Sequence, residues 1–203
     1  MATWAFSVVL LVVLPFAVLL RVSTYLYGSL LAQTWIALAG GVAATALVVT
    51  LYSSAILKKL TGKARVRVLA KRVALPLVLV YCAYTLLFLS SVNAKGAAVQ
   101  DYYRSLHPML RTAVSTLILL DSDIVITDLQ RTPDDYAAMG LPVQEESLHF
   151  RQGDGFVHAM DLRTVGRPDW RNSAVEFYFK VAGFQTLRHV GTADHLHVAL
   201  PVQ

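Results

Sequence analysis

The first hundred residues of the chain contain no acidic side chain, and they contain no histidine either. All 13 acids lie from Asp101 onward and all six histidines from His107 onward, so the 203-residue chain divides near residue 94 into two parts. The first part holds eight of the 18 basic residues, which leaves 18 − 8 = 10 bases against 13 acids in the second part. A mildly acidic polar part lacks the basic surplus of a nucleic-acid-binding domain. We therefore expect no nucleic-acid partner.

Cysteine is almost absent as well. The single Cys82 excludes a disulfide within the chain, and it excludes a zinc site built from thiolates. Because Cys82 stands within an apolar run, we interpret it as a small buried side chain.

Long apolar runs are plentiful in the first part. The chain is 56% hydrophobic with a mean hydropathy of +0.53, which is too apolar for an ordinary soluble domain. Three segments approach or exceed the roughly 18 to 20 residues that cross a bilayer as a helix, namely Trp4–Leu20, Ser29–Tyr52 and Val73–Val92. The first lacks the basic start and small-residue cleavage site of a signal peptide, so we expect it to be retained. Residues 1–93 are thus predicted to be a membrane region with three helices.

The distribution of basic residues predicts the orientation of these helices. Seven bases lie between the second and third segments, at Lys58, Lys59, Lys63, Arg65, Arg67, Lys71 and Arg72, whereas the other connection carries only Arg21. Basic residues remain on the cytoplasmic side. We therefore expect a cytoplasmic N-terminus, a cytoplasmic connection from Leu57 to Arg72, and everything after the third segment outside the cytoplasm.

Residues 94–203 are long enough for one compact domain that mixes helices and strands. A helix over residues 97–120 is interrupted at Pro108, and a second helix begins with Thr132 as N-cap and ends at Gly140. Alternation predicts strands in "DIVITDL", "HAMDLRT", "FQTLRHV" and "LHVAL". The mixture predicts an α+β domain.

The segment "SAVEFYFKVAGF" fits two structures. Its apolar residues alternate as in a strand, but Ser173 and Glu176 match a capping box, and Gly183 matches a helix stop. These end signals favour a helix.

Two histidine-containing clusters carry the chemistry of the polar part. "ESLHFRQGDGFVHAMDLRT" holds His149, His158 and Asp161, and "ADHLHVAL" holds His195 and His197, which share one face if the segment is a strand. Zinc accepts histidine and carboxylate ligands, and a catalytic zinc site has three protein ligands and one open position. Ordinary hydrogen-bonded histidines fit these residue types equally well.

The order of the motifs resembles that of the zinc D-alanyl-D-alanine carboxypeptidases and dipeptidases, whose fold is shared by the hedgehog signalling domain. The resemblance rests on "DLQRTPDDY", "ESLHFRQGDGFVHAMDL", "VAGFQTLRH" and "ADHLHVAL", which correspond to the family's Arg-Thr/Ser-Pro, Ser-x-His-x-x-Gly-x-Ala-x-Asp and His-x-His elements. It covers residues 97 to 201 and not the apolar segments. It implies an α+β fold with a small antiparallel sheet.

The resemblance also implies roles for individual residues. His149, Asp161 and His197 match the three zinc ligands, and Arg131 matches the arginine that steers or stabilises the substrate. Asp194 stands three residues before His197, where the peptidases place a general-base glutamate. His195 would line the site and hold an oxyanion, and His158 and Ser147 are further residues expected near it.

This chain departs from the family pattern at two positions. Eleven residues separate His149 from Asp161 where the family has six, and an inserted loop around Gly153 and Gly155 accounts for the difference. Alternatively, His158 is the ligand and His149 supports it, although His158 and Asp161 would face opposite sides of a strand. The second departure is Asp194, which is one methylene shorter than glutamate.

The resemblance implies a membrane-anchored zinc metallopeptidase in a bacterial plasma membrane. Its partners would be the lipid bilayer and a cell-wall peptide that contains D-alanine, and its cofactor would be Zn²⁺. Zinc lowers the pKa of a bound water, and Asp194 would accept the proton from that water. The alternative is a zinc-binding interaction module without turnover, like the hedgehog domain, which the shorter Asp194 favours.

Overall fold

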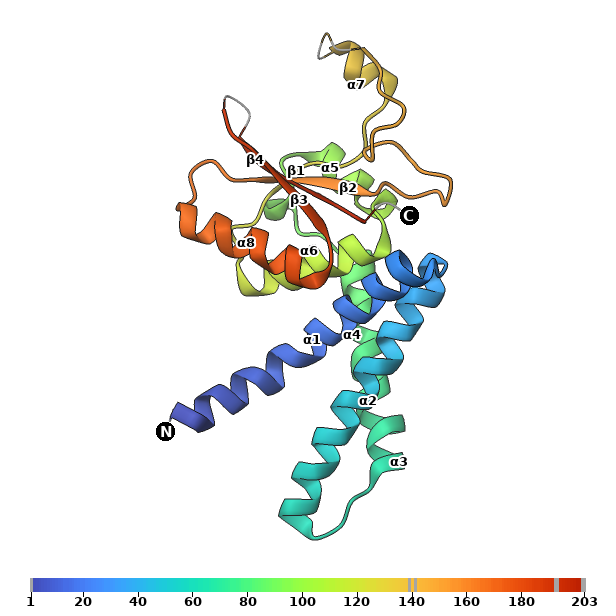
Figure 1. Ribbon diagram of the computed structural model, residues 1–203, viewed down its shortest axis with the longest axis vertical. Helices are drawn as coiled ribbons and strands as arrows, with labels where there is room; N and C mark the ends of the chain where they lie inside the picture. Colours follow the sequence, from blue (N-terminus) through green and yellow to red (C-terminus); the bar gives the residue numbers. More distant parts are fainter. Residues whose placement is uncertain (1, 139, 141, 192–193, 202–203) are drawn as a thin grey trace. The chain divides into compact units, whose positions relative to one another are not determined.

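The computed structural model describes residues 2–138, 140, 142–191 and 194–201, with side chains from Leu11 onward. The chain divides after Tyr84 into two compact units (Figure 1). The boundary predicted near residue 94 therefore lies earlier in the chain. The last turn of the preceding helix belongs to the second unit because its carbonyls are hydrogen-bonded there. The Tyr103 hydroxyl donates to the carbonyl of Thr85 at 2.7 Å, and Arg111 donates to the carbonyl of Leu86 at 2.6 Å.

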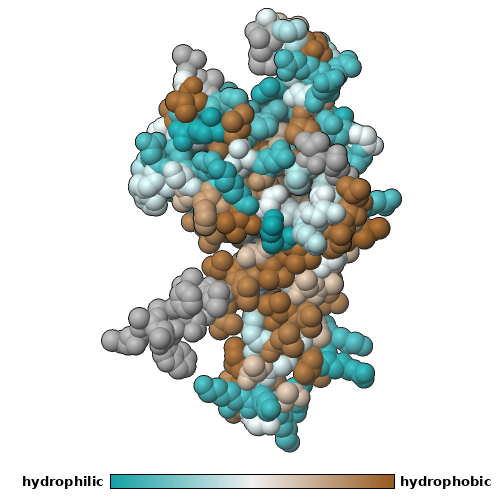
Figure 2. Space-filling view, viewed as in Figure 1, coloured by the Kyte–Doolittle hydropathy of each residue, from teal (hydrophilic) through white to brown (hydrophobic). Residues whose placement is uncertain are grey.

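The first unit is helical throughout. Its elements are α1 (Ala2–Leu30), α2 (Thr34–Thr61), α3 (Val66–Leu69), a π-helix (Ala70–Ala74) and α4 (Leu75–Leu87), the last of which continues into the second unit. Two described stretches, Leu11–Leu30 and Thr34–Thr61, are long and apolar enough to cross a membrane by length and composition. Exposed apolar side chains such as Leu47 and Leu51 give α2 a hydrophobic surface (Figure 2).

Close packing between α1 and α2 depends on a glycine. A Cβ atom at Gly41 would lie 2.7 Å from the backbone oxygen of Leu19 and 2.0 Å from Oγ of Ser23. Only a residue without a side chain allows the two backbones to approach this closely, as in membrane helix pairs. Cys82 is 6% exposed and packs with Leu19 and Val78, which agrees with its interpretation as a small buried side chain.

Two of the three predicted membrane helices are present as long apolar helices, and the third predicted segment does not form one uninterrupted α-helix. Within the described residues only two helices pass the length and composition test, because α4 has 13 residues and ends at Leu87 rather than Val92. At about 1.5 Å per residue such a helix is roughly 20 Å long, against about 30 Å of hydrocarbon. Before α4 the chain forms a π-helix (Ala70–Ala74), in which Lys71 and Arg72 precede the apolar residues that lead into α4.

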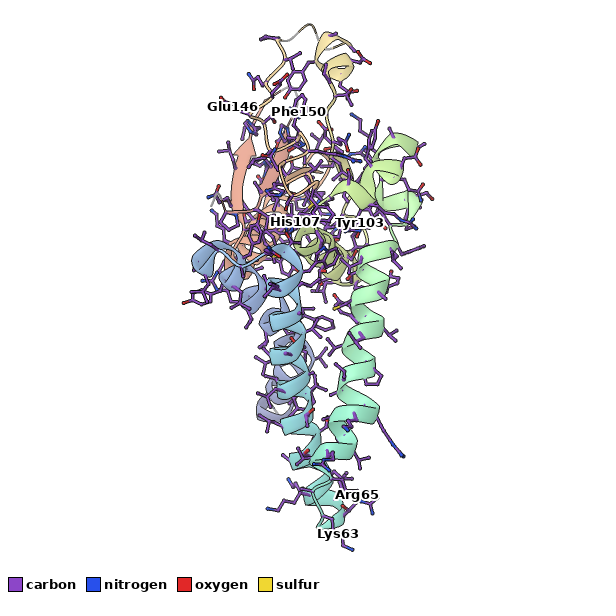
Figure 3. All side chains as sticks on the ribbon, turned by 90° about the vertical axis from the view of Figure 1, so that its right-hand side faces the viewer. Lys63, Arg65, Tyr103, His107, Glu146 and Phe150 are labelled. Carbon is purple, nitrogen blue, oxygen red and sulfur yellow. The ribbon has the colours of Figure 1, made fainter. Side chains whose placement is uncertain are left out.

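The connection predicted around Arg21 is also wrong, because Arg21 lies within α1. The turn between α1 and α2 spans only residues 31–33, where Leu31 has a positive φ of 52°. Lys63 and Arg65 lie in the connection that follows α2 (Figure 3).

The second unit is an α+β domain. Short helical turns at Ser91–Asn93, α5 (Ala97–Asp101) and Tyr102–Ser105 precede α6 (Pro108–Leu120), β1 (Ile126–Asp128) and α7 (Pro133–Ala138). There follow β2 (Ala159–Arg163), α8 (Asp169–Ala182), β3 (Gln185–His189) and β4 (His195–Ala199). The four strands form one antiparallel sheet in the order β1-β2-β4-β3. The predicted α+β class and small antiparallel sheet are therefore present.

Local sequence explains most of these elements. Pro108 occupies the first position of α6, where its missing N–H has no cost, so the predicted interruption is the start of a helix. The segment with two interpretations is the helix α8, and Gly183 ends it with a φ of 99°. However, α8 begins at Asp169 after Pro168, so Ser173 lies inside the helix and the predicted capping box is wrong.

The core of this unit lies between the sheet and its helices. Met160, Leu162 and Leu196 of the sheet are at most 1% exposed, as is Phe179 of α8. Burying each such side chain contributes about 1.5 to 3 kcal/mol. The packed sheet gives β2 and β4 a fixed register, and this register positions the polar residues described next.

Candidate metal centre

Three segments bring His149, Asp161 and His197 together. Asp161 in β2 and His197 in β4 are direct partners across the antiparallel ladder, so their side chains share one face of the sheet. His149 lies in the long connection between α7 and β2. The backbone N–H of Arg131 donates to the carbonyl of His149 at 3.0 Å and ties this connection to the segment after β1. The sheet register and one backbone bond thus position the three side chains.

The spacing of the three side chains fits a single metal ion. His149 Nε2 lies 3.3 Å from His197 Nδ1 and 3.4 Å from Asp161 Oδ1, and His197 Nδ1 lies 2.8 Å from Asp161 Oδ1. Ligands at about 2.0 to 2.1 Å from a tetrahedral zinc ion are separated by about 3.3 Å. The group could therefore hold a metal ion with little movement.

The hydrogen bond on the far side of His149 fixes its tautomer. Nδ1 of His149 lies 2.6 Å from the carbonyl oxygen of Leu129, which can only accept, so Nδ1 carries the proton. The lone pair of Nε2 then points toward Asp161 and His197. Metal-binding histidines are oriented by this type of outer hydrogen bond. His149 is 3% exposed, so its ring is held away from bulk solvent.

Asp161 is ionised and is shared between two sets of partners. Burial alone would raise its pKa, but the adjacent imidazoles of His149 and His197 outweigh burial, and the pKa is lowered. Oδ1 faces the two histidines, while Oδ2 lies 3.2 Å from Nη2 of Arg131 and 3.7 Å from Nε2 of His195. Arg131 is held in turn by Asp128, whose Oδ2 accepts from Nε at 2.7 Å. One carboxylate oxygen is thus available to a metal while the other orients the arginine.

A cavity of about 660 Å³ borders this centre. Its lining includes Asp161 and three of the predicted site residues, Arg131, Asp194 and His195. The cavity therefore joins one candidate metal ligand to a guanidinium, an imidazole and a carboxylate. A small peptide or a similar solute fits this volume.

Asp194 lies at the cavity but is fully engaged. Arg188 donates to both of its oxygens, from Nε at 2.7 Å and from Nη2 at 2.9 Å, and the Thr164 hydroxyl donates at 2.5 Å. These bonds, led by that of Arg188, lower the pKa of Asp194 to about 2. A carboxylate held this way is a weak proton acceptor, so its role as general base requires Arg188 to release it.

Two other predicted residues lie apart from the cavity. His158 stands immediately before β2 and contacts Asp154 instead of Asp161, so the structure groups His149 with the other ligands. Ser147 accepts a hydrogen bond from the backbone N–H of His149 at 3.3 Å and thereby supports the connection.

The sequence did not reveal the residues that support the site. The carbonyl of Leu129 leaves no trace in a side-chain pattern, and Arg188 pairs with Asp194 only because β3 and β4 form a hairpin. The sequence showed Arg188 on the predicted strand before "ADHLHVAL", but it did not show that Asp194 is its partner.

Comparison of the chain with protein-family models, with curated proteins and with solved structures finds no match.

Proposed function

We propose that this chain is a membrane-anchored zinc hydrolase that acts on peptides. The observation that carries the proposal is the convergence of His149, Asp161 and His197 beside a cavity that also exposes Arg131. Two histidines and one carboxylate leave the fourth zinc position open, as in catalytic centres. Zinc in such a centre supplies a water molecule that ionises near neutral pH.

The residues around the cavity have the chemistry that a peptidase needs. Arg131 presents a guanidinium that can pair with a substrate carboxylate or carbonyl, and Asp128 and Asp161 hold it in place. His195, like Arg131, faces Oδ2 of Asp161, and it can donate to an oxygen that becomes negative during hydrolysis. Asp194 is the proposed proton acceptor. It becomes available when Arg188 releases it.

The substrate class rests on the sequence resemblance. The order of the Arg131, His149–Asp161 and Asp194–His197 motifs is that of peptidases that cleave D-alanine-containing cell-wall peptides. We therefore propose a D-Ala-terminated peptide as substrate, with Arg131 bound to its terminal carboxylate. A bacterial plasma membrane is the corresponding location.

Hydrolysis is tested on the full chain purified in detergent, loaded with zinc and incubated with peptides that end in D-Ala-D-Ala. Asp194→Ala should retain zinc and lower turnover by about 10²- to 10⁴-fold, because it removes the proton acceptor. Asp194→Glu should preserve or raise activity. Glu146→Gln, which changes an exposed carboxylate, is the matched control. A wild type and an Asp194→Glu variant that bind zinc but are both inactive would contradict the proposal.

The second candidate is a zinc-binding interaction module without turnover. The bidentate pair between Arg188 and Asp194 favours it, since a carboxylate with a pKa of about 2 is poorly suited to accept a proton. In this case the cavity binds a peptide that is not cleaved. Peptide binding by the zinc-loaded chain, measured by calorimetry with no product formed over hours, distinguishes the module from the enzyme.

The membrane topology is part of the same proposal. We infer from its charge that the segment from Lys58 to Arg72 is cytoplasmic, and we infer that the N-terminus lies on the same side. A cell-wall substrate requires the second unit to lie outside, so the chain must cross once more through α4 and the π-helix before it. Since α4 has only 13 residues, Lys71 and Arg72 would have to extend toward the cytoplasmic interface.

A topology reporter distinguishes the two arrangements. An enzyme that is active only outside the cytoplasm, fused after Gln203, should be active, and the same fusion within the basic segment after Gly62 should be silent. The reverse pattern would place the second unit in the cytoplasm and exclude a cell-wall substrate.

A further inference from the structure

A second group of two histidines and one aspartate lies elsewhere in the second unit. His107 precedes α6, Asp154 lies in the connection between His149 and β2, and His158 immediately precedes β2 (Figure 3 labels His107). His158 Nε2 lies 3.0 Å from both oxygens of Asp154, and His107 Nε2 lies 3.7 Å from Oδ2. One ligand atom from each residue lies within 4.8 Å of the other two.

We propose that His107, Asp154 and His158 form a second, weaker site for a divalent transition metal ion such as zinc. The separations of 3.0 and 3.7 Å bracket the roughly 3.3 Å expected between ligands of a tetrahedral zinc ion. Two imidazoles and one carboxylate are also the ligand types of the first centre. Small shifts of the Asp154 side chain, which is 30% exposed, would equalise the distances.

The backbone builds this group with defined bonds. The N–H of His107 donates to the carbonyl of Val157 at 2.9 Å, and the N–H of Val157 donates to the carbonyl of Ser105 at 2.8 Å. The N–H of Phe156 donates to Oδ1 of Asp154 at 3.0 Å, and Gly155 adopts a φ of 83° that a larger residue rarely takes. The connection between His149 and β2 therefore supplies two of the three ligands, Asp154 and His158.

The two groups differ in the tautomer that the protein imposes. Nδ1 of His107 accepts from the backbone N–H of Met109 at 3.3 Å, as the cap of α6. His107 therefore carries its proton on Nε2, the atom that faces Asp154. Metal binding at Nε2 requires this proton to move to Nδ1. Nδ1 can then no longer accept from the N–H of Met109, so the cap of α6 is lost. Loss of a cap alone changes an equilibrium constant by about fivefold. We therefore expect the second site to bind at least about fivefold more weakly than the first.

An ion at this site would join the start of α6 to the start of β2. The N–H of His158 donates to the carbonyl of Leu148 at 2.9 Å, directly beside the first-site ligand His149. Both sites thus share one connection, and the second ion would fix its last part, from Asp154 to His158. Its role is structural.

The test is a titration of the full chain in detergent micelles, stripped by a chelator, with Co²⁺ followed by its absorption and with Zn²⁺ followed by elemental analysis. Wild type should bind two ions per chain, with dissociation constants separated by at least about fivefold. Asp154→Asn and His158→Ala should each lose only the weaker ion. Glu146→Gln and His189→Ala are the matched controls and should keep both.

A complementary variant guards against loss of folding. His149→Ala should lose the tighter ion and keep the weaker one. Saturation of wild type at one ion per chain would overturn the proposal, and so would two ions in Asp154→Asn. Loss of both ions in each variant would also overturn it, because the two sites would then not be independent.

Discussion

The two His–Asp–His groups of the second unit contain the same residue types but differ in the hydrogen bond on one far nitrogen. In the first group, Nδ1 of His149 faces a carbonyl at 2.6 Å and must donate. In the second, Nδ1 of His107 faces a backbone N–H at 3.3 Å and must accept. The first imidazole therefore offers a lone pair to the group, while the second offers a proton. Residue identity alone does not make a metal ligand, because the outer partner selects the atom that is free to bind.

The surroundings of the two groups differ as well. The first borders a cavity of about 660 Å³ through Asp161, with Arg131 and His195 in its lining. In the second, burial followed by the effect of His158 lowers the pKa of His107 to about 3, and its side chain is fully enclosed. Access to solutes suits the first group to catalysis or ligand binding. The second group joins the buried His107 to the more exposed Asp154 in the connection before β2, which suits it to a structural role.

The largest expected effect is on the first group. His149→Ala should weaken the tighter zinc ion by more than about 100-fold, since removal of a ligand exceeds the effect of removing an outer partner. Competition with a coloured zinc chelator measures the change. A variant that retained tight zinc would break the distinction between the two groups.

Removal of the metal should lower thermal stability. A ligand at 100 times its dissociation constant stabilises the folded state by about 2.7 kcal/mol, so chelation should lower the melting temperature of the second unit by several degrees. Differential scanning with and without zinc measures this shift. If chelation left the melting temperature of wild type unchanged, and added zinc did not raise it, a bound ion at either group would be contradicted.

Release of Asp194 sharpens the choice between enzyme and binding module. Arg188→Gln removes the main cause of the low pKa of Asp194 and should raise peptide hydrolysis several-fold, because a stronger base transfers the proton more readily. Zinc content should not change. Activity that falls together with zinc content would instead assign Arg188 to support of the metal centre.

The same pair has a defined pH dependence. Asp194 has a folded pKa of about 2, below the ordinary value of about 3.9, so the stabilisation from Arg188 is present above about pH 4. It is lost as the pH falls from about 4 toward 2. The stability difference between wild type and Arg188→Gln should therefore be constant near neutrality and shrink only in this acidic range.

The smallest expected effect separates the two roles of His107. His107→Asn keeps an acceptor for the N–H of Met109, whereas His107→Ala leaves α6 without this cap. Both variants should lose the weaker ion, but the alanine variant should be less stable than the asparagine variant by about 1 kcal/mol. Chemical denaturation in the absence of metal measures the difference. Equal stability would show that the 3.3 Å contact does not cap the helix.

Local patterns predicted much of the fold. Alternation identified the strands, Pro108 marked a helix boundary, and the resemblance of the motifs to those of zinc peptidases selected His149, Asp161 and His197. The third apolar segment was misinterpreted because hydropathy does not reveal that the chain leaves the helix at Leu87 and forms a π-helix around Lys71. The start of α8 was missed because Ser173 and Glu176 match a capping box, although Ser173 lies inside a helix that begins at Asp169, directly after Pro168.

The rest depends on contacts between distant residues. His107 and Asp154 approach each other because the backbone of Val157 pairs with that of Ser105 and His107. Arg188 engages Asp194 through the pairing of β3 with β4. Such contacts are properties of the folded chain, and motif spacing along the sequence carries no information about them.

The most direct test of the central claim is the zinc content of three full-length proteins after dialysis against limiting zinc. Wild type and His158→Ala should each retain one tightly bound ion, while His149→Ala should retain none at that concentration. Tight zinc that survives in His149→Ala and disappears in His158→Ala would contradict the assignment of the first centre to His149, Asp161 and His197.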